Sequence, residues 1–204
     1  MKISIDGNLG SGKSTLMSNL EKHYDNFDNP GILFTQEPVK IWQPYLNNFY
    51  NDMKNSSLAL QMKILKHHIQ VPSGNNNLIS LTERSATSCI DIFGKYLLNK
   101  GLLNSLDIDL MKDYDNSFGS HPDMYIYIKT NASICANRIN LRNRESEDSI
   151  SFDYIESIDN LYNERYCNNI DKSKNYYIID GSKNEKEVLK DTVSIIDYSL
   201  QNLS

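Results

Sequence analysis

Short apolar segments alternate with longer amphipathic segments along this chain. Continuous apolar runs predict strands at about 2–6, 32–34, 78–81, 124–128 and 176–179. Apolar residues spaced three and four apart predict helices at about 13–24, 41–51, 55–70, 85–100, 103–117, from 132 onward, 151–168 and 184–202. Strands that alternate with helices are typical of a parallel sheet with helices on both faces. We therefore expect a three-layer α/β fold with a five-stranded parallel sheet, in a single domain over residues 1–204.

Composition narrows the possible function classes. The net charge of −5 argues against a nucleic-acid polymer as partner, because such a partner usually requires a basic face. The three cysteines are far apart and form no CxxC pair, so the sequence indicates neither a zinc site nor a disulfide framework, and it favours a reducing compartment. No apolar run approaches membrane-spanning length, and no signal or transit segment precedes the first predicted strand. We expect a cytoplasmic protein without a membrane partner.

The first predicted strand ends in a glycine-rich loop that matches the pattern GxxxxGKS. The loop and the start of the following helix read Gly7-Asn8-Leu9-Gly10-Ser11-Gly12-Lys13-Ser14-Thr15. Glycines let a backbone turn tightly and approach phosphates, and the N–H groups of the loop and helix start supply positive potential. Lys13 can reach the β- and γ-phosphates, and the Ser14 hydroxyl can hold Mg²⁺. This strand–loop–helix context predicts a P-loop fold that binds ATP and Mg²⁺.

Charged side chains end the next two predicted strands. Glu37, followed by Pro38, ends the second strand, where open α/β sheets bind ligands. A carboxylate beside a hydroxyl acceptor can take the hydroxyl proton during phosphoryl transfer. Glu83 and Arg84 end the third strand, where Glu83 could hold Mg²⁺ through water and Arg84 could orient Glu37 or the reacting oxygens. An exposed loop glutamate and a solvated charge pair are the alternatives.

Three arginines follow the fourth predicted strand. Arg138 and Arg142 are four residues apart and share one helical face, and Arg144 comes shortly after them. Their charges can cover a transferring phosphoryl group, as a lid over about 138–150 would. A mixed-charge surface helix is the alternative, because acidic residues follow the arginines directly.

Together these motifs resemble the deoxyribonucleoside kinase family, which includes deoxycytidine, deoxyguanosine and mitochondrial-type thymidine kinases. The similarity spans about residues 1–180 and rests on the glycine-rich loop, Glu37-Pro38-Val39 with Trp42, Glu83-Arg84-Ser85 and Arg138-x-x-x-Arg142-x-Arg144. The loop is shared by many NTPases, but the four motifs in this order and spacing are specific. The resemblance implies a nucleoside 5′-kinase that uses ATP and Mg²⁺, and it implies a homodimer.

The resemblance implies catalytic roles for several of these positions. Glu37 resembles the general base on the nucleoside 5′-hydroxyl, Arg84 the arginine beside it, and Glu83 the acid linked to Mg²⁺. Asp180 and the residues after it resemble the loop around the adenine of the phosphate donor. The family's lid arginines resemble Arg138, Arg142 and Arg144.

Other positions resemble the family's nucleoside pocket. Trp42 resembles the side chain that shapes the pocket, and Tyr50 and Glu147 resemble the pair that grips the sugar 3′-hydroxyl. Gln61, eleven residues after Tyr50, resembles the glutamine that hydrogen-bonds the base, and Phe93 resembles the aromatic residue that stacks on it. On the sequence alone, the alternatives are that the aromatic residues are ordinary core residues and that Gln61 and His68 are surface residues of an amphipathic helix.

The substrate preference is predicted from the base-facing positions. Deoxycytidine-type and purine-accepting members of the family resemble one another in carrying an arginine–aspartate pair around the base. At the matching positions this chain has His68 and Cys89 instead. Ile64 lies one helical turn before His68. A small apolar wall leaves room for the thymine methyl group, and Gln61 can pair with thymine or cytosine. We expect thymidine and deoxycytidine as substrates, with thymidine favoured and purines poor.

Two other functions fit parts of this pattern. A nucleoside monophosphate kinase of the thymidylate type has a similar sheet, but its anionic acceptor needs cationic clamps rather than a carboxylate base. A catalytically silent nucleotide-binding regulatory subunit would be free to lose Lys13, Ser14 and Glu37, and this chain retains all of them. The pattern therefore favours a nucleoside kinase over both alternatives.

Overall fold

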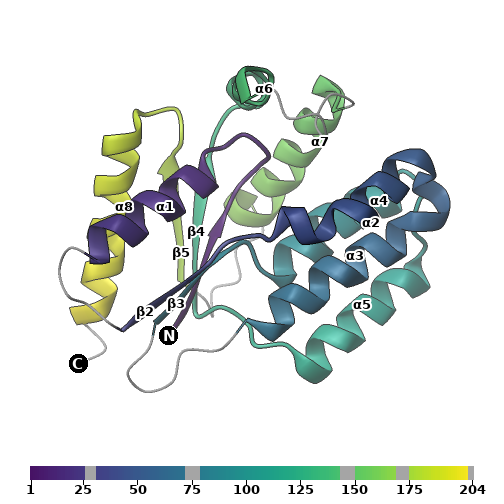
Figure 1. Ribbon diagram of the computed structural model, residues 1–204, viewed down its shortest axis with the longest axis horizontal. Coiled ribbons are helices and arrows are strands. Elements are labelled where there is room, and N and C mark those ends of the chain that lie inside the picture. The colour runs from purple at the N-terminus through teal and green to yellow at the C-terminus, as the bar shows by residue number, and fades with distance from the viewer. Residues whose placement is uncertain (26–30, 72–78, 143–149, 169–174, 202–204) are drawn as a thin grey trace.

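The computed structural model describes residues 1–25, 31–71, 79–142, 150–168 and 175–201. Within these residues the strands form a five-stranded sheet in the order β2-β3-β1-β4-β5, and every pairing is parallel (Figure 1). The strands are β1 Lys2–Asp6, β2 Ile32–Thr35, β3 Ile79–Glu83, β4 Met124–Lys129 and β5 Asn175–Asp180. The predicted α/β class and parallel sheet are confirmed.

The central strand β1 places the glycine-rich loop at the middle of the sheet. All of its residues are buried, and Ile3 and Ile5 have no exposed surface. It pairs with β3 through Ile5 and Glu83, and with β4 through Asp6 and Tyr127. Because all the strands are parallel, their carboxyl ends lie along one edge of the sheet. The glycine-rich loop and Glu83 therefore meet at that edge.

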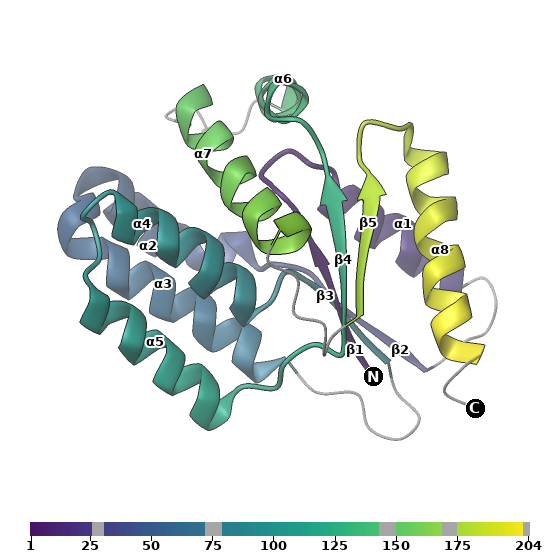
Figure 2. The same ribbon diagram turned by 180° about the vertical axis from the view of Figure 1, so that it is seen from behind.

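Helices cover both faces of the sheet (Figures 1 and 2). On one face, α1 (Lys13–Asp25) and α8 (Glu185–Gln201) pack a mainly aliphatic core that includes Leu16, Met17 and Ile196. The helices on the other side are α2 (Val39–Asn51), α3 (Met53–Gln70), α4 (Lys95–Asn99), α5 (Ser105–Phe118) and α7 (Phe152–Asn163). The helix α6 (Ala132–Arg142) lies beyond the carboxyl ends of the strands, above the glycine-rich loop.

Two helical regions differ in detail from the prediction. The segment expected as one helix over 85–100 contains a π-helical stretch, η1 (Ser88–Gly94), before α4, and α7 continues into a second one, η3 (Glu164–Asn168). The wider winding of a π-helix changes which side chains share a face, and such stretches are frequent at functional sites. Here η1 carries Cys89 and Phe93, two of the predicted pocket residues.

Asp52 separates the two helices that were predicted at 41–51 and 55–70. Its side chain accepts a hydrogen bond from the Asn55 N–H at 3.2 Å, which caps the start of α3. Among the described residues, no helix combines the length and apolar character that crossing a membrane would require.

Candidate active site

The glycine-rich loop joins β1 to α1 and packs directly against α6. Gly10 adopts φ +72, and a Cβ added there would lie 2.5 Å from the Cys135 carbonyl oxygen of α6. Gly12 adopts φ +99, which also favours glycine. The loop therefore depends on glycine both for its backbone angles and for its close approach to the helix that carries the lid arginines.

Lys13 lies across this loop. Its ammonium donates to the Asn8 carbonyl oxygen at 2.7 Å, and the residue is 4% exposed. Burial lowers the pKa of Lys13 to about 8, and the nearby Arg84 acts in the same direction. A buried cation at the base of a phosphate loop is a strong partner for phosphate oxygens, because little water competes with it.

Ser14 and Glu83 place two oxygen donors next to the loop. The Ser14 hydroxyl donates to Glu83 Oε1 at 2.8 Å. Mg²⁺ in kinases is usually held by one or two protein oxygens together with substrate phosphates and water, and a hydroxyl beside a carboxylate fits that arrangement. The described residues contain no group of three or more His, Cys, Asp and Glu side chains that could hold a metal without phosphate.

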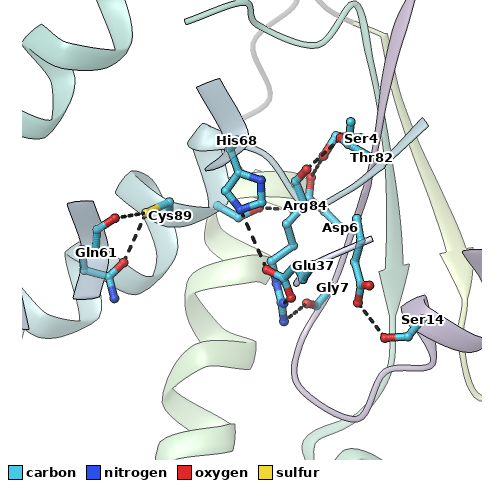
Figure 3. A network of polar contacts seen from close by, with 12 residues as sticks. Ser4, Asp6, Gly7, Ser14, Glu37, Gln61, His68, Thr82, Arg84 and Cys89 are labelled. Carbon is cyan, nitrogen blue, oxygen red and sulfur yellow. Dashed lines mark hydrogen bonds and ion pairs between the residues drawn. The ribbon is translucent and has the colours of Figure 1, made fainter. Parts of the chain in front are cut away.

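Glu37 and Arg84 form a buried ion pair at the ends of β2 and β3. Arg84 Nη1 donates to Glu37 Oε2, and Arg84 Nη2 donates to the Gly7 carbonyl oxygen at 3.3 Å (Figure 3). Burial raises the pKa of Glu37, although the positive charge of Arg84 opposes the shift. For Arg84, burial lowers the pKa, but Glu37, Tyr162 and Glu83 together outweigh it and hold the pKa above its ordinary value. The pair thus joins the loop that holds phosphate to a carboxylate that can act as a base.

His68 lies on the other side of the Glu37 carboxylate (Figure 3). Its Nε2 is 3.8 Å from Glu37 Oε1, and this buried nitrogen has no hydrogen-bond partner in the described structure. Burial holds the pKa of His68 well below its usual value, so the ring is neutral at pH 7. The indole of Trp42 packs edge-on against it, with ring centroids 6.3 Å apart.

Gln61 and Cys89 face each other from α3 and η1. Cys89 Sγ lies 3.3 Å from Gln61 Oε1 and 3.4 Å from the Gln61 carbonyl oxygen (Figure 3). Burial raises the pKa of Cys89, which therefore remains a thiol. Phe93 lies further along η1, and its ring faces the Arg84 guanidinium at 5.2 Å.

A single cavity of about 1350 Å³ connects these groups. It runs from the phosphate loop past Glu37 and Arg84, and it brings together all the predicted pocket residues that the structure describes. These are Trp42, Tyr50, Gln61, Ile64, His68, Cys89 and Phe93. Of the nucleotide-binding residues, Leu9, Gly10, Ser11, Gly12, Lys13, Ser14 and Thr15 line it. A nucleoside and a triphosphate could therefore occupy one continuous space.

The predicted lid is described in part. Arg138 lines the cavity and donates to the carbonyl oxygens of Ser11, at 3.3 Å, and Gly181, at 3.0 Å. Arg142 also lines the cavity. Arg144 and Glu147 lie outside the described residues.

Asp180 does not line the cavity. Its carboxylate accepts hydrogen bonds from the N–H and hydroxyl of Ser182, at 2.9 and 2.6 Å, and it shapes the turn after β5. Gly181 and Lys183 from this turn line the cavity instead. The turn, rather than the Asp180 side chain, therefore reaches the expected donor site.

Asn8 of the predicted phosphate loop donates to the Ile155 carbonyl oxygen at 2.9 Å and ties the loop to α7. Two further residues at the site, both on α7, have no motif in the sequence. Tyr154 lines the cavity. The Tyr162 hydroxyl accepts a hydrogen bond from Arg84 Nε at 3.2 Å. Tyr162 belongs to the buried stripe of α7, and the partly buried Tyr154 packs against the same core, so their positions indicate only a core-facing helix.

Comparisons with known proteins agree with this geometry. The family model described as deoxynucleoside kinase matches residues 3–200. Protein 029R of Invertebrate iridescent virus 3 is 31% identical over 183 residues, which cover 89% of this chain and 88% of that protein. The deoxyadenosine/deoxycytidine kinase of Bacillus subtilis (strain 168) is 30% identical over 172 residues, which cover 78% of this chain and 74% of that protein.

The fold is also found among solved structures. A deoxyadenosine kinase from M. mycoides, with the products dCMP and dCDP bound, superposes with a TM-score of 0.81 and 23% identity. The superposition covers 97% of this chain and 100% of the other. Given the extent of the family match and the arrangement of the phosphate loop, the ion pair and the cavity, the chain belongs to the deoxynucleoside kinase family of ATP-dependent phosphotransferases.

Proposed function

We propose that this protein transfers the γ-phosphoryl group of ATP to the 5′-hydroxyl of a deoxyribonucleoside, with thymidine and deoxycytidine as preferred acceptors. One observation carries the proposal. A buried carboxylate, Glu37, lines the same cavity as Lys13 and Ser14 of the phosphate loop. Phosphoryl transfer to a hydroxyl requires a proton acceptor and a phosphate site in one enclosed space.

In this reaction Glu37 accepts the proton of the 5′-hydroxyl as its oxygen attacks the γ-phosphorus, and ADP leaves. Burial raises the pKa of Glu37, which makes it a stronger base than an exposed glutamate. Lys13 and the lid arginines stabilise the charge that develops on the phosphoryl oxygens. Ser14, and Glu83 through water, would hold Mg²⁺, which would neutralise the β- and γ-phosphate oxygens.

The same geometry disfavours a monophosphate acceptor. A monophosphate would bring a second negative charge toward the Glu37 carboxylate, and the nearest cation, Arg84, is already paired with Glu37. A silent nucleotide-binding subunit is disfavoured because Lys13, Ser14 and Glu37 keep both their chemical type and their places around one cavity.

The pyrimidine preference rests on the wall formed by Gln61, His68 and Cys89. Burial keeps His68 neutral and Cys89 protonated, so no ion pair is available for the exocyclic groups of a purine. The M. mycoides deoxyadenosine kinase has been solved with dCTP and with dATP bound, so a purine acceptor is the competing outcome.

The test is kcat/KM for the four natural deoxynucleosides at fixed ATP and Mg²⁺, with dTMP and dCMP assayed in parallel. We expect thymidine and deoxycytidine to exceed both purines by at least about tenfold, or about 1.4 kcal/mol. A purine value above both pyrimidines would overturn the preference. Turnover of the monophosphates alone would overturn the acceptor class, and no turnover of any acceptor would favour the silent subunit.

The resemblance to the family also supports a proposal about assembly and location. We propose a homodimer that works in the cytoplasm, as a single domain over residues 1–204. Sedimentation of the purified protein at several concentrations tests the dimer, and a mass equal to one chain throughout would exclude it.

A further inference from the structure

Arg84 is held more firmly than its ion pair with Glu37 requires. Its backbone adopts φ 60, an angle that non-glycine residues rarely adopt. Its guanidinium donates from Nη1 to Glu37, from Nη2 to the Gly7 carbonyl oxygen and from Nε to the Tyr162 hydroxyl, and Phe93 covers one face of it. Glu37 exchanges a proton in every turnover of the proposed reaction, so the other contacts must fix the guanidinium when that partner is neutral.

Of the three hydrogen-bond partners of the Arg84 guanidinium, Tyr162 is the one that belongs neither to the phosphate loop nor to the proposed base. It comes from α7, is fully buried, and accepts from Arg84 Nε at 3.2 Å. Its ring lies nearly parallel to those of Tyr127 and Tyr166, with centroids 5.5 and 5.9 Å away and interplanar angles of 7° and 22°. Since stacked rings on buried neighbours cannot swing away without leaving a void, the hydroxyl stays in place.

Asp6 is the acidic group beside the phosphate loop that acts on the Tyr162 hydroxyl. Burial and the negative charge of Asp6 raise the pKa of Tyr162. Asp6 is fully buried, directly precedes Gly7, and accepts hydrogen bonds from the hydroxyls of Ser4, at 2.6 Å, and Ser88. The phenol therefore keeps its proton, and its oxygen accepts from Arg84 Nε.

We propose that Tyr162 is a positioning residue, whose hydroxyl aims the Arg84 guanidinium at Glu37 and so keeps the base aligned with the phosphate loop. The proposal rests on the proposed function for the role of Glu37 as base. The competing explanation is that Tyr162 serves only as a core aromatic residue, as its place in the apolar stripe of α7 indicates. The two explanations differ only in the role of the Tyr162 hydroxyl, so a variant without that oxygen distinguishes between them.

The experiment compares Tyr162→Phe with two matched controls, Tyr166→Phe and Tyr127→Phe. All three rings are buried in the same stack, but in the described structure the hydroxyls of Tyr166 and Tyr127 have no hydrogen-bond partner. We expect Tyr162→Phe to lower kcat about tenfold with KM for the nucleoside within about twofold, in line with losing one hydrogen bond to a charged group. Both controls should keep kcat within about twofold.

The pH profile supplies a readout that a purely structural role would leave unchanged. The charged and titratable groups that face Glu37 are Arg84, Lys13, Glu83, Asp6, His68 and Cys89, and none of them is altered by the substitution. Arg84 lowers the pKa of Glu37, so a loosened guanidinium lets that pKa rise. The acidic limb of kcat should therefore move to higher pH in Tyr162→Phe and stay in place in both controls.

A spectroscopic measurement keeps the test independent of activity and of the variant's folding. In the wild-type protein, the Arg84 Nε–H should give a ¹H–¹⁵N signal that exchanges slowly with water, and this signal should shift in Tyr162→Phe. Rapid exchange in the wild type, or unchanged kcat and pH profile in a folded Tyr162→Phe, would overturn the proposal. If the wild type turns over no nucleoside, the proposed function fails, while the Arg84 signal still decides whether Tyr162 holds the guanidinium.

Discussion

Replacing Glu37 with glutamine removes the proposed base and leaves its shape. General-base removal typically costs about 10²–10⁴-fold in kcat, or about 2.7–5.4 kcal/mol of transition-state free energy. The loss in free energy of unfolding should be smaller than the loss of transition-state stabilisation. Both side chains of the pair are about one-tenth exposed, at 11% for Glu37 and 9% for Arg84. Leaving a buried charge without any partner costs about 3–5 kcal/mol, but a glutamine oxygen can still accept from Arg84, so we expect a loss of about 1–3 kcal/mol.

The assay is steady-state ADP release for kcat, calorimetry for nucleoside binding, and thermal unfolding for stability. A matched control is Glu164→Gln, which neutralises an ion pair of 2.7 Å with Lys95 in which both side chains are over 40% exposed. That variant should keep kcat and lose at most about 1 kcal/mol of stability. A Glu37→Gln protein that keeps kcat within threefold of wild type, or that loses nucleoside binding while kcat holds, would refute the assignment of Glu37 as the base.

Three further outcomes are expected. Lys13→Ala should lower kcat by about 10²-fold or more, because the β- and γ-phosphate charge loses a buried cation in the transition state; a folded variant with wild-type kcat would contradict this. Burial raises the pKa of Glu37, so the wild-type kcat should begin to fall, as the pH is lowered, at a higher pH than an exposed glutamate would cause; an acidic limb at the ordinary glutamate pKa would argue against it. Gly10→Ala should lower the melting temperature more than Gly101→Ala, because both have positive φ but only the Gly10 Cβ would meet backbone, at 2.5 Å from Cys135 O. Equal shifts in thermal unfolding would contradict that reasoning.

The elements of the fold could be predicted because their signals are local. The apolar run Ile3-Ser4-Ile5 and the stripe Leu58, Met62, Leu65 and Ile69 carry the strand and helix periods within a few residues. The strand order could not be predicted in the same way. Neighbouring strands such as β1 and β4 pair Ile3 with Met124, which are far apart in the chain. Nothing in either run specifies its partner, since buried parallel strands all present continuous apolar residues.

The residues of the candidate site also divide into those with a local signal in the sequence and those without one. Glu37 and Arg84 were predictable because a charged residue at the end of an apolar strand has no role in a core. Asp6 also ends its strand, but it was not singled out, because the glycine-rich loop that follows it already accounted for the chemistry of that segment. Tyr162 gave no signal at all, because a tyrosine at a core position of a helix packs its ring in the same way whether or not its hydroxyl has a partner. Contacts made by one polar atom of a mostly apolar side chain are visible only in three dimensions.

The two faces of the sheet differ in the kind of side chain that fills their cores. The face under α1 and α8 is mainly aliphatic, with Leu20 and Ile126 fully buried and Tyr24 as its buried aromatic residue. The face under α7 carries Tyr125, Tyr127, Tyr162 and Tyr166, whose rings fill volume as leucine would but bring hydroxyl groups into the interior. A buried arginine needs fixed hydrogen-bond acceptors, since water cannot reach it and leaving it unpaired is costly. The aromatic face supplies such an acceptor behind Arg84 without opening the core, and a guanidinium held from behind needs little reorganisation when charge develops at the reacting phosphoryl group.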